Sequence, residues 1–249
     1  MRRVLLTLSY DGTRYVGWQW QNNGISIQQK VEEALHALTR ENIRVMGASR
    51  TDGGVHAMGQ RCHFDTNCTI PDASFALAMN TKLPLDIRVV HAQTVPSDFH
   101  ARFHPCQKQY TYRIWNSPYA HTLFRHAYAH VTKPMQSAPI HTALNDLLGT
   151  HDFAAFQAAG GTANTTIRTL HECHLTVEGN LFTLIIRGNA FLYNMVRIIA
   201  GTSIAIGQGQ LPESTFSEAL ASHDRLTLGF TAPAHGLELT RIQYDGMPN

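Results

Sequence analysis

Cysteine is scarce in this sequence, and its spacing argues against two common roles. The four cysteines are Cys62, Cys68, Cys106 and Cys173, and no two of them form a C-x-x-C pair. This scatter disfavours both a zinc ribbon and a disulfide scaffold. Free thiols are therefore expected.

Long apolar runs and several well-known enzyme motifs are also missing. No run reaches the roughly 18 apolar residues of a membrane span, and the N-terminus lacks the apolar stretch of a signal peptide. We therefore expect no membrane association and a cytoplasmic location. The sequence has no Walker loop, no G-x-S-x-G elbow and no dinucleotide fingerprint. Nucleotide-cofactor and serine-hydrolase functions thus have no support.

Charge is low and nearly balanced. Charged residues make up 15% of the 249 residues and the net charge is +2, which by itself does not indicate a nucleic-acid-binding protein. Only four of the 20 cations are lysines. The planar fork of arginine suits phosphates and base edges, so the composition is compatible with an RNA surface.

The pattern of the first half predicts alternating strands and helices. Apolar residues at helical spacing follow Ser26, which can cap a helix together with Gln29 three residues on. Asp72 is expected to cap a second helix. The predicted elements are a strand at 4–10, a helix at 27–38, a strand at 43–46, a helix at 72–79 and a strand at 87–95.

The second half shows a similar order, which predicts an α+β fold of two similar halves with helices packed on sheets. We expect the halves to span residues 1–105 and 106–249, with a cleft between them as the natural site. The predicted elements are a strand at 110–115, a helix at 140–148, two strands around a turn at 178–180, a helix from about Phe191 and a strand at 237–244.

A single carboxylate stands out in the run from Gly47 to His56. Asp52 follows Arg50 by two residues and precedes Gly53 and Gly54, at the point where a strand breaks into a loop. The arginine favours the ionised carboxylate, and the glycines leave room for a bulky substrate. Asp52 is therefore a candidate nucleophile or base, and the simpler alternative is a turn carboxylate that bonds to its own backbone.

Two further candidates lie in the second half. Tyr110 shares a strand face with Tyr112, and such rings either pack in a core or stack on a base. Arg197 falls opposite the apolar face of the helix predicted from Phe191. It is either a solvated cation or a partner for a buried carboxylate such as Asp52.

Fifteen histidines raise the possibility of a metal site or a metal-dependent nuclease. The run His171-Glu172-Cys173-His174 does not converge on a strand, because His174 points away from His171 and Cys173. Neither this cluster nor the one at 121–130 has a zinc spacing. We therefore expect no metal site.

The segment 47–60, G-A-S-R-T-D-G-G-V-H-A-x-G-Q, resembles the catalytic motif of the TruA family of tRNA pseudouridine synthases. The similarity continues in the same order over nearly the whole chain. Further matching motifs are Tyr10-Asp11-Gly12, Gly17-Trp18-Gln19, the segment 98–103, Tyr110-x-Tyr112, Asn189-Ala190-Phe191 and Met195-Val196-Arg197.

This resemblance assigns roles to the candidate residues. It implies that Asp52 is the catalytic nucleophile, that Tyr110 stacks on the target base and that Arg197 pairs with Asp52. It associates Arg50 with RNA binding and with holding a flipped nucleotide out of the stack. Gly53, which borders the substrate, stands where the family commonly has alanine.

The resemblance also implies the fold, the substrate and the partners. The expected fold is the pseudouridine synthase fold, with two similar halves around a basic cleft. The expected substrates are uridines 38, 39 and 40 of the tRNA anticodon stem and loop, modified by a homodimer that needs no metal or organic cofactor. A non-catalytic tRNA-binding or RNA-folding protein that keeps the same frame is the alternative.

Overall fold

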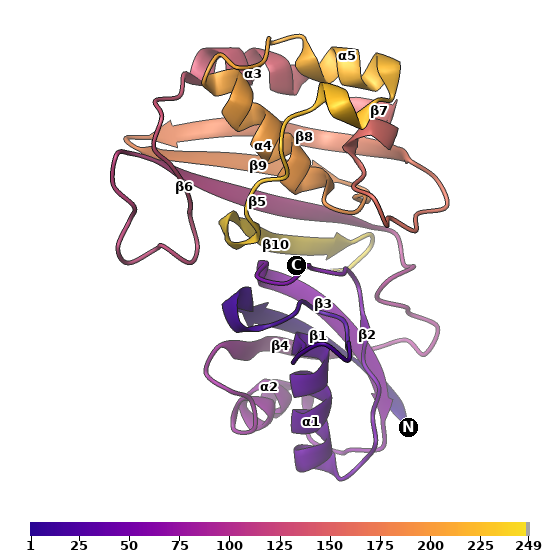
Figure 1. The fold of residues 1–249 in the computed structure, drawn as a ribbon. Helices are drawn as coiled ribbons and strands as arrows, with labels where there is room; N and C mark the ends of the chain where they lie inside the picture. Colours follow the sequence, from indigo (N-terminus) through magenta and orange to yellow (C-terminus); the bar gives the residue numbers. More distant parts are fainter. Residues whose placement is uncertain (248–249) are drawn as a thin grey trace. The chain divides into compact units, whose positions relative to one another are not determined.

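The computed structural model describes residues 1–247 and divides the chain into two compact units. Unit 1 contains Met1–Cys106 and the chain from Glu238 onwards, and unit 2 contains Gln107–Leu237. Helices and mostly antiparallel strands alternate in both units, which confirms the predicted α+β class (Figure 1). The closing strand, β10, therefore clusters with the first part of the chain.

The sheet of unit 1 is formed around β1. This strand pairs antiparallel with β3 on one side and with β4 on the other. β2 pairs antiparallel with β3, whereas β10 pairs with β3 in parallel. The strands are β1 (Arg2–Tyr10), β2 (Met46–Gly47), β3 (His56–Thr66), β4 (Ile87–Val95) and β10 (Leu237–Tyr244).

Two helices cover this sheet, α1 (Ile27–Thr39) and α2 (Asp72–Asn80), and they lie side by side (Figure 1). Ser26 caps α1 as predicted, because its hydroxyl accepts a hydrogen bond from the Gln29 amide at 3.1 Å. The prediction for Asp72 was wrong: Pro71 precedes the helix, and the Asp72 carboxylate instead binds Arg2 at 2.7 Å. A short 3-10 helix, η1 (Gly12–Arg14), follows β1.

The sheet of unit 2 has the order β5-β9-β8-β7, with neighbours antiparallel, and β6 pairs with β5 in parallel. The two strands predicted around the turn at 178–180 are β8, which ends at Glu178, and β9, which begins at Leu181. The strands are β5 (Cys106–Asn116), β6 (Ala129–Val131), β7 (Gly149–Asp152), β8 (Ile167–Glu178) and β9 (Leu181–Gly188).

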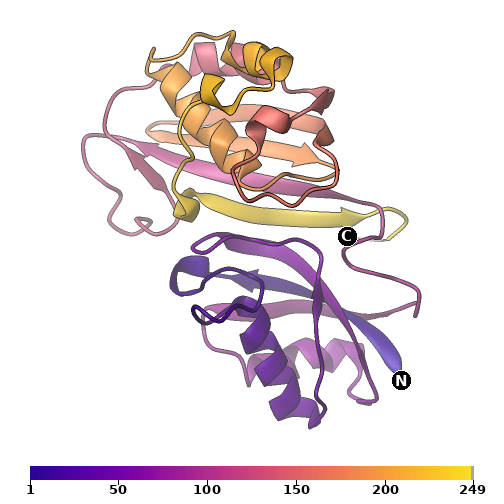
Figure 2. The same ribbon diagram turned by 45° about the vertical axis from the view of Figure 1, so that its right-hand side comes forward.

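The helices of unit 2 gather on one face of its sheet (Figure 2). They are α3 (Ser137–Asn145), α4 (Met195–Gly207) and α5 (Thr215–Ser222), with the 3-10 helices η2 (Ala154–Phe156), η3 (Arg225–Thr227) and η4 (Ala234–Gly236). All residues of α4 except Arg197 are buried. This helix therefore forms the centre of the unit 2 core.

Three predicted elements have other boundaries in the structure, and one strand was missed. The helix predicted at 140–148 is α3, which begins at Ser137 and ends at Asn145. The strand predicted at 43–46 is reduced to Met46–Gly47, because residues 43–45 adopt no regular structure. The helix predicted from Phe191 begins at Met195, after Asn194 adopts a left-handed conformation with φ of 60°. The 11-residue strand β3 was not predicted, although it lies at the centre of the unit 1 sheet.

No helix among residues 1–247 combines the length and the apolar character needed to cross a membrane.

Candidate active site

Asp52 lies in the loop between β2 and β3, and this loop is bound to the segment Tyr15–Trp18. The Trp18 amide donates to the Thr51 carbonyl at 3.0 Å, and the Gly54 amide donates to the Tyr15 carbonyl at 3.3 Å. Asp52 itself forms an isolated antiparallel bridge with Gly17. The backbone on both sides of the aspartate is therefore fixed within unit 1.

The loop turns directly after Asp52. The Val55 amide donates to the Asp52 carbonyl at 3.1 Å, and Gly54 adopts a φ of 80°. Residues with a side chain rarely adopt this backbone conformation, so a glycine suits the position. Asp52 is half-buried, whereas Arg50 and Gly53 are exposed. Solvent, and hence a substrate, can reach this part of the loop.

A buried polar network lies beneath the loop. The Tyr10 hydroxyl is 2.7 Å from the Thr51 hydroxyl, and the Gln60 amide donates to the Ser49 carbonyl at 2.7 Å. Gln60 is fully buried, and buried polar groups are costly unless they are hydrogen-bonded. Ser49 and Thr51, which flank Arg50 and precede Asp52, are thus anchored to the sheet through side chains of β1 and β3.

The sequence did not identify Tyr10 and Gln60 as functional residues. Both nevertheless belong to the motifs that carry the family resemblance, Tyr10-Asp11-Gly12 and the final glutamine of segment 47–60. Their bonds join residues 41 and 11 positions apart in the chain. These motifs were the only signal in the sequence that could have identified Tyr10 and Gln60. They do not reveal which partners the two side chains bind.

Gly17 allows the close approach of the loop. It adopts a φ of 108°, and a Cβ at this position would collide with the Thr51 carbonyl oxygen and lie 3.0 Å from the Asp52 carbonyl carbon. Contacts this close force a shift of the backbone. Gly17 is therefore a structural requirement for the position of Asp52.

Tyr110 lies on β5 of unit 2 and is buried, with 6% of its surface exposed. Its ring packs edge-on against Phe191, with centroids 5.0 Å apart and an interplanar angle of 81°. Tyr112 is more deeply buried, and its hydroxyl donates to the Pro233 carbonyl at 2.8 Å. Burial raises the pKa of Tyr112, and the charge of the nearby Arg197 offsets this rise only in part. Tyr112 is a core residue.

Arg197 lies in the first turn of α4 and is held in place by its own unit. Its Nε donates to the Ala232 carbonyl at 2.8 Å, and its Nη1 donates to the Asn194 side-chain oxygen at 2.9 Å. The Ala232 amide in turn donates to the Arg197 carbonyl at 3.0 Å. A guanidinium that bonds at Nε and Nη1 in this way has a fixed direction, unlike a solvated surface cation.

The predicted site residues fall into two groups. Arg50, Asp52 and Gly53 belong to one loop of unit 1. Tyr110 and Arg197 belong to unit 2, where Tyr112 lies two residues after Tyr110 in sequence and Pro233 follows the arginine-bound Ala232. That Asp52 meets Tyr110 and Arg197 stays a prediction.

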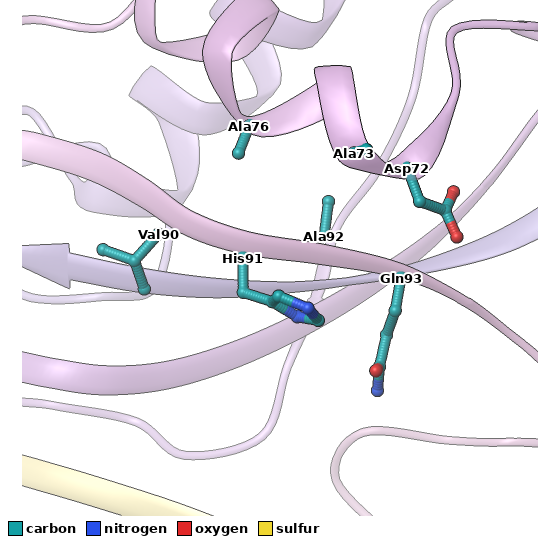
Figure 3. Close-up of a pocket in the computed structure, with 7 residues that line it drawn as sticks. All are labelled: Asp72, Ala73, Ala76, Val90, His91, Ala92 and Gln93. Carbon is teal, nitrogen blue, oxygen red and sulfur yellow. The ribbon is translucent and has the colours of Figure 1, made fainter. Parts of the chain in front are cut away.

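A surface hollow of about 390 Å³ lies elsewhere on unit 1, between α2 and β4 (Figure 3). It contains none of the predicted site residues, and the Asp72 carboxylate on its rim binds Arg2 and Thr94. Among residues 1–247, no three histidine, cysteine, aspartate or glutamate side chains are grouped so that they could hold a metal ion. The residues lining the hollow are Asp72, Ala73, Ala76, Val90, His91, Ala92 and Gln93.

Comparison with known proteins identifies the family. The family model described as tRNA pseudouridine synthase matches residues 7–104 and 143–245. A protein of Ruminiclostridium cellulolyticum named tRNA pseudouridine synthase A is 45% identical over 98% of this chain and 100% of its own length. The protein of the same name from Acetivibrio thermocellus is 43% identical, with the same coverage. The tRNA pseudouridine synthase A 2 of Clostridium perfringens is 42% identical, again with the same coverage.

The family model covers the loop of Asp52 and the start of α4, whereas Tyr110 of β5 lies between its two matched ranges. The relatives extend the similarity to almost every residue of the chain. The chain therefore belongs to the tRNA pseudouridine synthase family.

Proposed function

We propose that this chain converts uridines 38, 39 and 40 of the tRNA anticodon stem-loop to pseudouridine, with Asp52 as the nucleophile. Membership of the family makes the chain an isomerase that acts on uridine in tRNA. The anticodon positions, the role of the aspartate and the flipping of the target base are the finer parts of the proposal.

The observation that carries the role of Asp52 is the anchoring of its loop. Backbone bonds at Thr51 and Gly54 and the buried hydroxyl pair of Tyr10 and Thr51 fix the residues around a half-buried carboxylate. A reacting group has to be held in one geometry, because orientation alone contributes several kcal/mol to catalysis, about 7–11 in the best cases. This rigid loop with an accessible carboxylate supports a catalytic residue better than it supports an ordinary turn.

Arg197 is proposed to pair with Asp52. Its Nε and Nη1 bonds to Ala232 and Asn194 fix the direction of the guanidinium, which has five N–H donors. A charge-assisted bond from such a group would favour the ionised carboxylate and aim it. An ionised aspartate is the form required for attack or for proton abstraction.

Tyr110, Arg50 and Gly53 are proposed to hold the substrate. A uridine in a stem has to leave the stack before an enzyme can reach it, at a cost of a few kcal/mol. Tyr110 would stack on the extruded base, and the exposed Arg50 would occupy the space left behind or bind the RNA backbone. Gly53 is exposed beside Asp52 and leaves room for the nucleotide.

The reaction requires that the base is detached from its sugar, turned and rejoined through carbon 5. A single carboxylate can drive the detachment by attacking the base, by attacking the sugar or by removing a sugar proton. All three routes are compatible with the proposal. None of them requires a metal ion or an organic cofactor.

The proposal also assigns the parts of the chain. Residues 1–105 would carry the catalytic loop, and residues 106–249 would carry the stacking tyrosine and the paired arginine. Two copies would act as a homodimer on the anticodon arm.

The test is release of tritium from tRNA that contains 5-tritiated uridine, since rejoining through carbon 5 displaces this atom. Asp52→Asn should reduce release by at least about 10³-fold, which is the scale of losing an enzymic nucleophile. Asp146→Asn is the matched control, because it makes the same change at an exposed carboxylate of α3's C-terminal end and should leave release unchanged.

Persistent release by Asp52→Asn would remove Asp52 from the catalytic role. If the native chain binds tRNA but releases no tritium, the non-catalytic RNA-binding alternative would be favoured. If the native chain releases tritium, sequencing the product tRNA for pseudouridine would show whether positions 38, 39 and 40 are the targets.

A further inference from the structure

Negative charge is missing from a long stretch of the chain. Residues 99–145 contain no aspartate or glutamate, whereas they contain five arginines or lysines and six histidines. The net charge of +2 for the whole chain conceals this asymmetry. The segment therefore carries a local excess of positive charge, which favours a polyanion as its partner.

Part of this stretch forms a compact loop between β5 and β6 of unit 2, which we call the aromatic loop (residues 117–128). The two strands that flank it pair in parallel, with Ile114 opposite Ala129. Its rings pack on one another: Phe124 stacks on Tyr128 at 4.9 Å, and His121 packs against Phe124 at 4.9 Å. His121 also meets Trp115 of β5 at 4.8 Å.

Hydrogen bonds within the loop fix its backbone. The Trp115 indole donates to the Tyr119 carbonyl at 3.0 Å, and the Ala127 and Tyr128 amides both donate to the Phe124 carbonyl at 2.9 Å. These bonds and the ring contacts restrain the loop in the conformation observed. Such preorganisation lowers the entropy lost when a ligand binds.

The loop nevertheless exposes large apolar side chains. Tyr119 is 82% exposed, Leu123 is 81% exposed and Phe124 is 45% exposed. Arg125 is exposed beside them and donates to the Thr122 carbonyl at 3.0 Å. An ordered loop that presents rings and a cation together, without a carboxylate, has the composition of a surface that binds unpaired bases and phosphates.

We propose that the aromatic loop is a second RNA-binding surface, on which Tyr119 stacks against an unpaired base of the tRNA while Arg125 binds a phosphate. The inference rests on the proposed function only in taking tRNA as the substrate. It adds a contact that acts on binding and not on the chemistry at the target uridine. Neither Tyr119 nor Arg125 belongs to the catalytic machinery.

Charge decides between RNA and a second copy of the chain as the occupant. A two-fold interface places the same patch on both subunits, so cations on the patch approach one another unless carboxylates lie among them. Residues 99–145 supply none. A polyanion meets no such repulsion.

The test measures the affinity of the full-length chain for an unmodified tRNA transcript by fluorescence anisotropy. Tyr119→Ala should raise Kd roughly 5- to 100-fold, the range found when a stacking ring is removed. Tyr119→Phe should retain the native affinity, because it keeps the ring. Leu226→Ala is the surface control, since Leu226 is 88% exposed in the same unit but lies in η3.

Arg125→Gln should reduce the slope of log affinity against log salt by about one, as expected for one lost phosphate contact. Lys82→Gln, which removes an exposed cation from unit 1, is its control and should leave the slope unchanged. Tritium release at saturating tRNA should be native in all these variants. Their folding can be checked by intrinsic tryptophan fluorescence, to which Trp115 contributes together with Trp18 and Trp20. Tyr119→Ala keeps the backbone carbonyl that binds the Trp115 indole.

Native affinity of Tyr119→Ala for tRNA would overturn the proposal. A change in sedimentation of Tyr119→Ala with unchanged affinity would assign the loop to protein–protein contact instead. The outcome is independent of Asp52, because Asp52→Asn tests chemistry while these variants test binding. Weak binding by Tyr119→Ala together with full release by Asp52→Asn would preserve this inference and refute the nucleophile.

Discussion

Gly17 and Gly53 both lie close to Asp52, but only Gly53 has room for a side chain. Gly17 has a φ of 108° and no room for a Cβ beside the Thr51 carbonyl. Gly53 has no such conformation, and a Cβ there would be 3.5 Å from its nearest neighbours, the Tyr15 carbonyl and the Val16 backbone. This distance is an ordinary van der Waals contact. An alanine at position 53 therefore fits the loop that an alanine at position 17 would disrupt.

We predict that Gly53→Ala raises the free energy of unfolding by about 0.4–1 kcal/mol, because it restricts the unfolded chain without straining the folded one. Tritium release should stay near the native rate. Gly17→Ala is the matched control and should lower stability by more than about 1 kcal/mol and impair release, because it displaces Thr51 and Asp52. Urea unfolding of both variants measures the difference. A destabilised Gly53→Ala would show that the loop lacks the space described.

At this scale the sequence indicated the candidate residues but not what holds them. The Arg-Thr-Asp-Gly-Gly run pointed to Asp52 through its composition alone. The support from Gln60 and Tyr10 was not predictable, because a hydrogen-bond partner is determined by the register between strands and not by local pattern. The matching motifs contain both residues, and the structure shows that they bind Thr51 and Ser49 of the loop.

Among the elements, those with a strong local signal were predicted best. The predicted strand at 87–95 has the observed bounds of β4, and the cap of α1 is formed by Ser26 as expected. β3 was missed because its sequence, HAMGQRCHFDT, lacks clear apolar alternation and is rich in polar residues. Polar side chains such as Gln60 and His63 are buried there, with hydrogen bonds that only tertiary contacts provide.

The start of α4 shows a different limit of prediction from the sequence. Phe191 and Leu192 fit the helical spacing, but Asn194 adopts a left-handed conformation and the helix begins after it. At 100° per residue, the sequence also places Gly201 on the same helix face as Arg197, opposite the apolar residues. In the structure Gly201 is buried, because the helix packs there against the backbone at Phe230 and Ala232.

We predict that Gly201→Ala lowers the free energy of unfolding by about 1–3 kcal/mol, the usual cost of overpacking a core. A Cβ at position 201 would collide with the Phe230 carbonyl and force this segment away from α4. The two hydrogen bonds that join Arg197 to Ala232 would then weaken, and tritium release should fall as well. Urea unfolding and the release assay measure both effects.

Ser203→Ala is the control for this substitution on the same helix. The Ser203 hydroxyl is buried and has no hydrogen-bond partner among the residues that the structure describes. Its removal should be neutral or stabilising, because an unsatisfied polar group is lost. Equal destabilisation by both variants would contradict the prediction. It would show that the cost of Gly201→Ala is not specific to the contact with the Phe230 carbonyl.

For the whole molecule, the fold class was predictable and the assembly of the site was not. Alternating helix and strand patterns identify an α+β chain from local spacing alone. The path of β10 follows from no local pattern, because Leu237–Tyr244 is far in sequence from the strand β3 with which it pairs. The residues proposed to act together likewise come from segments more than 50 positions apart, so their meeting depends on long-range packing.

Global stability should depend on one buried histidine of unit 1. His63 on β3 is 4% exposed, and its Nδ1 accepts a hydrogen bond from the Ala101 amide at 3.1 Å. Its ring packs edge-on against His100, with centroids 4.7 Å apart. Burial, with repulsion from His100 and Arg3 that outweighs the attraction of Asp65, lowers the pKa of His63 to about 4. The folded protein thus keeps this side chain neutral.

We predict that the free energy of unfolding rises between about pH 4 and pH 6.5, by at most about 1.4 kcal/mol per pH unit from this group. In this window the unfolded chain binds a proton at His63 and the folded chain does not, so acid favours unfolding. The contribution is complete above the unfolded pKa and is lost as the pH falls towards 4. His63→Asn, which retains an acceptor for the Ala101 amide, should flatten the profile measured by urea unfolding. His91→Asn, at an exposed histidine of β4, should leave it unchanged. An unaltered slope in His63→Asn would mean that other groups determine the acid sensitivity of the fold.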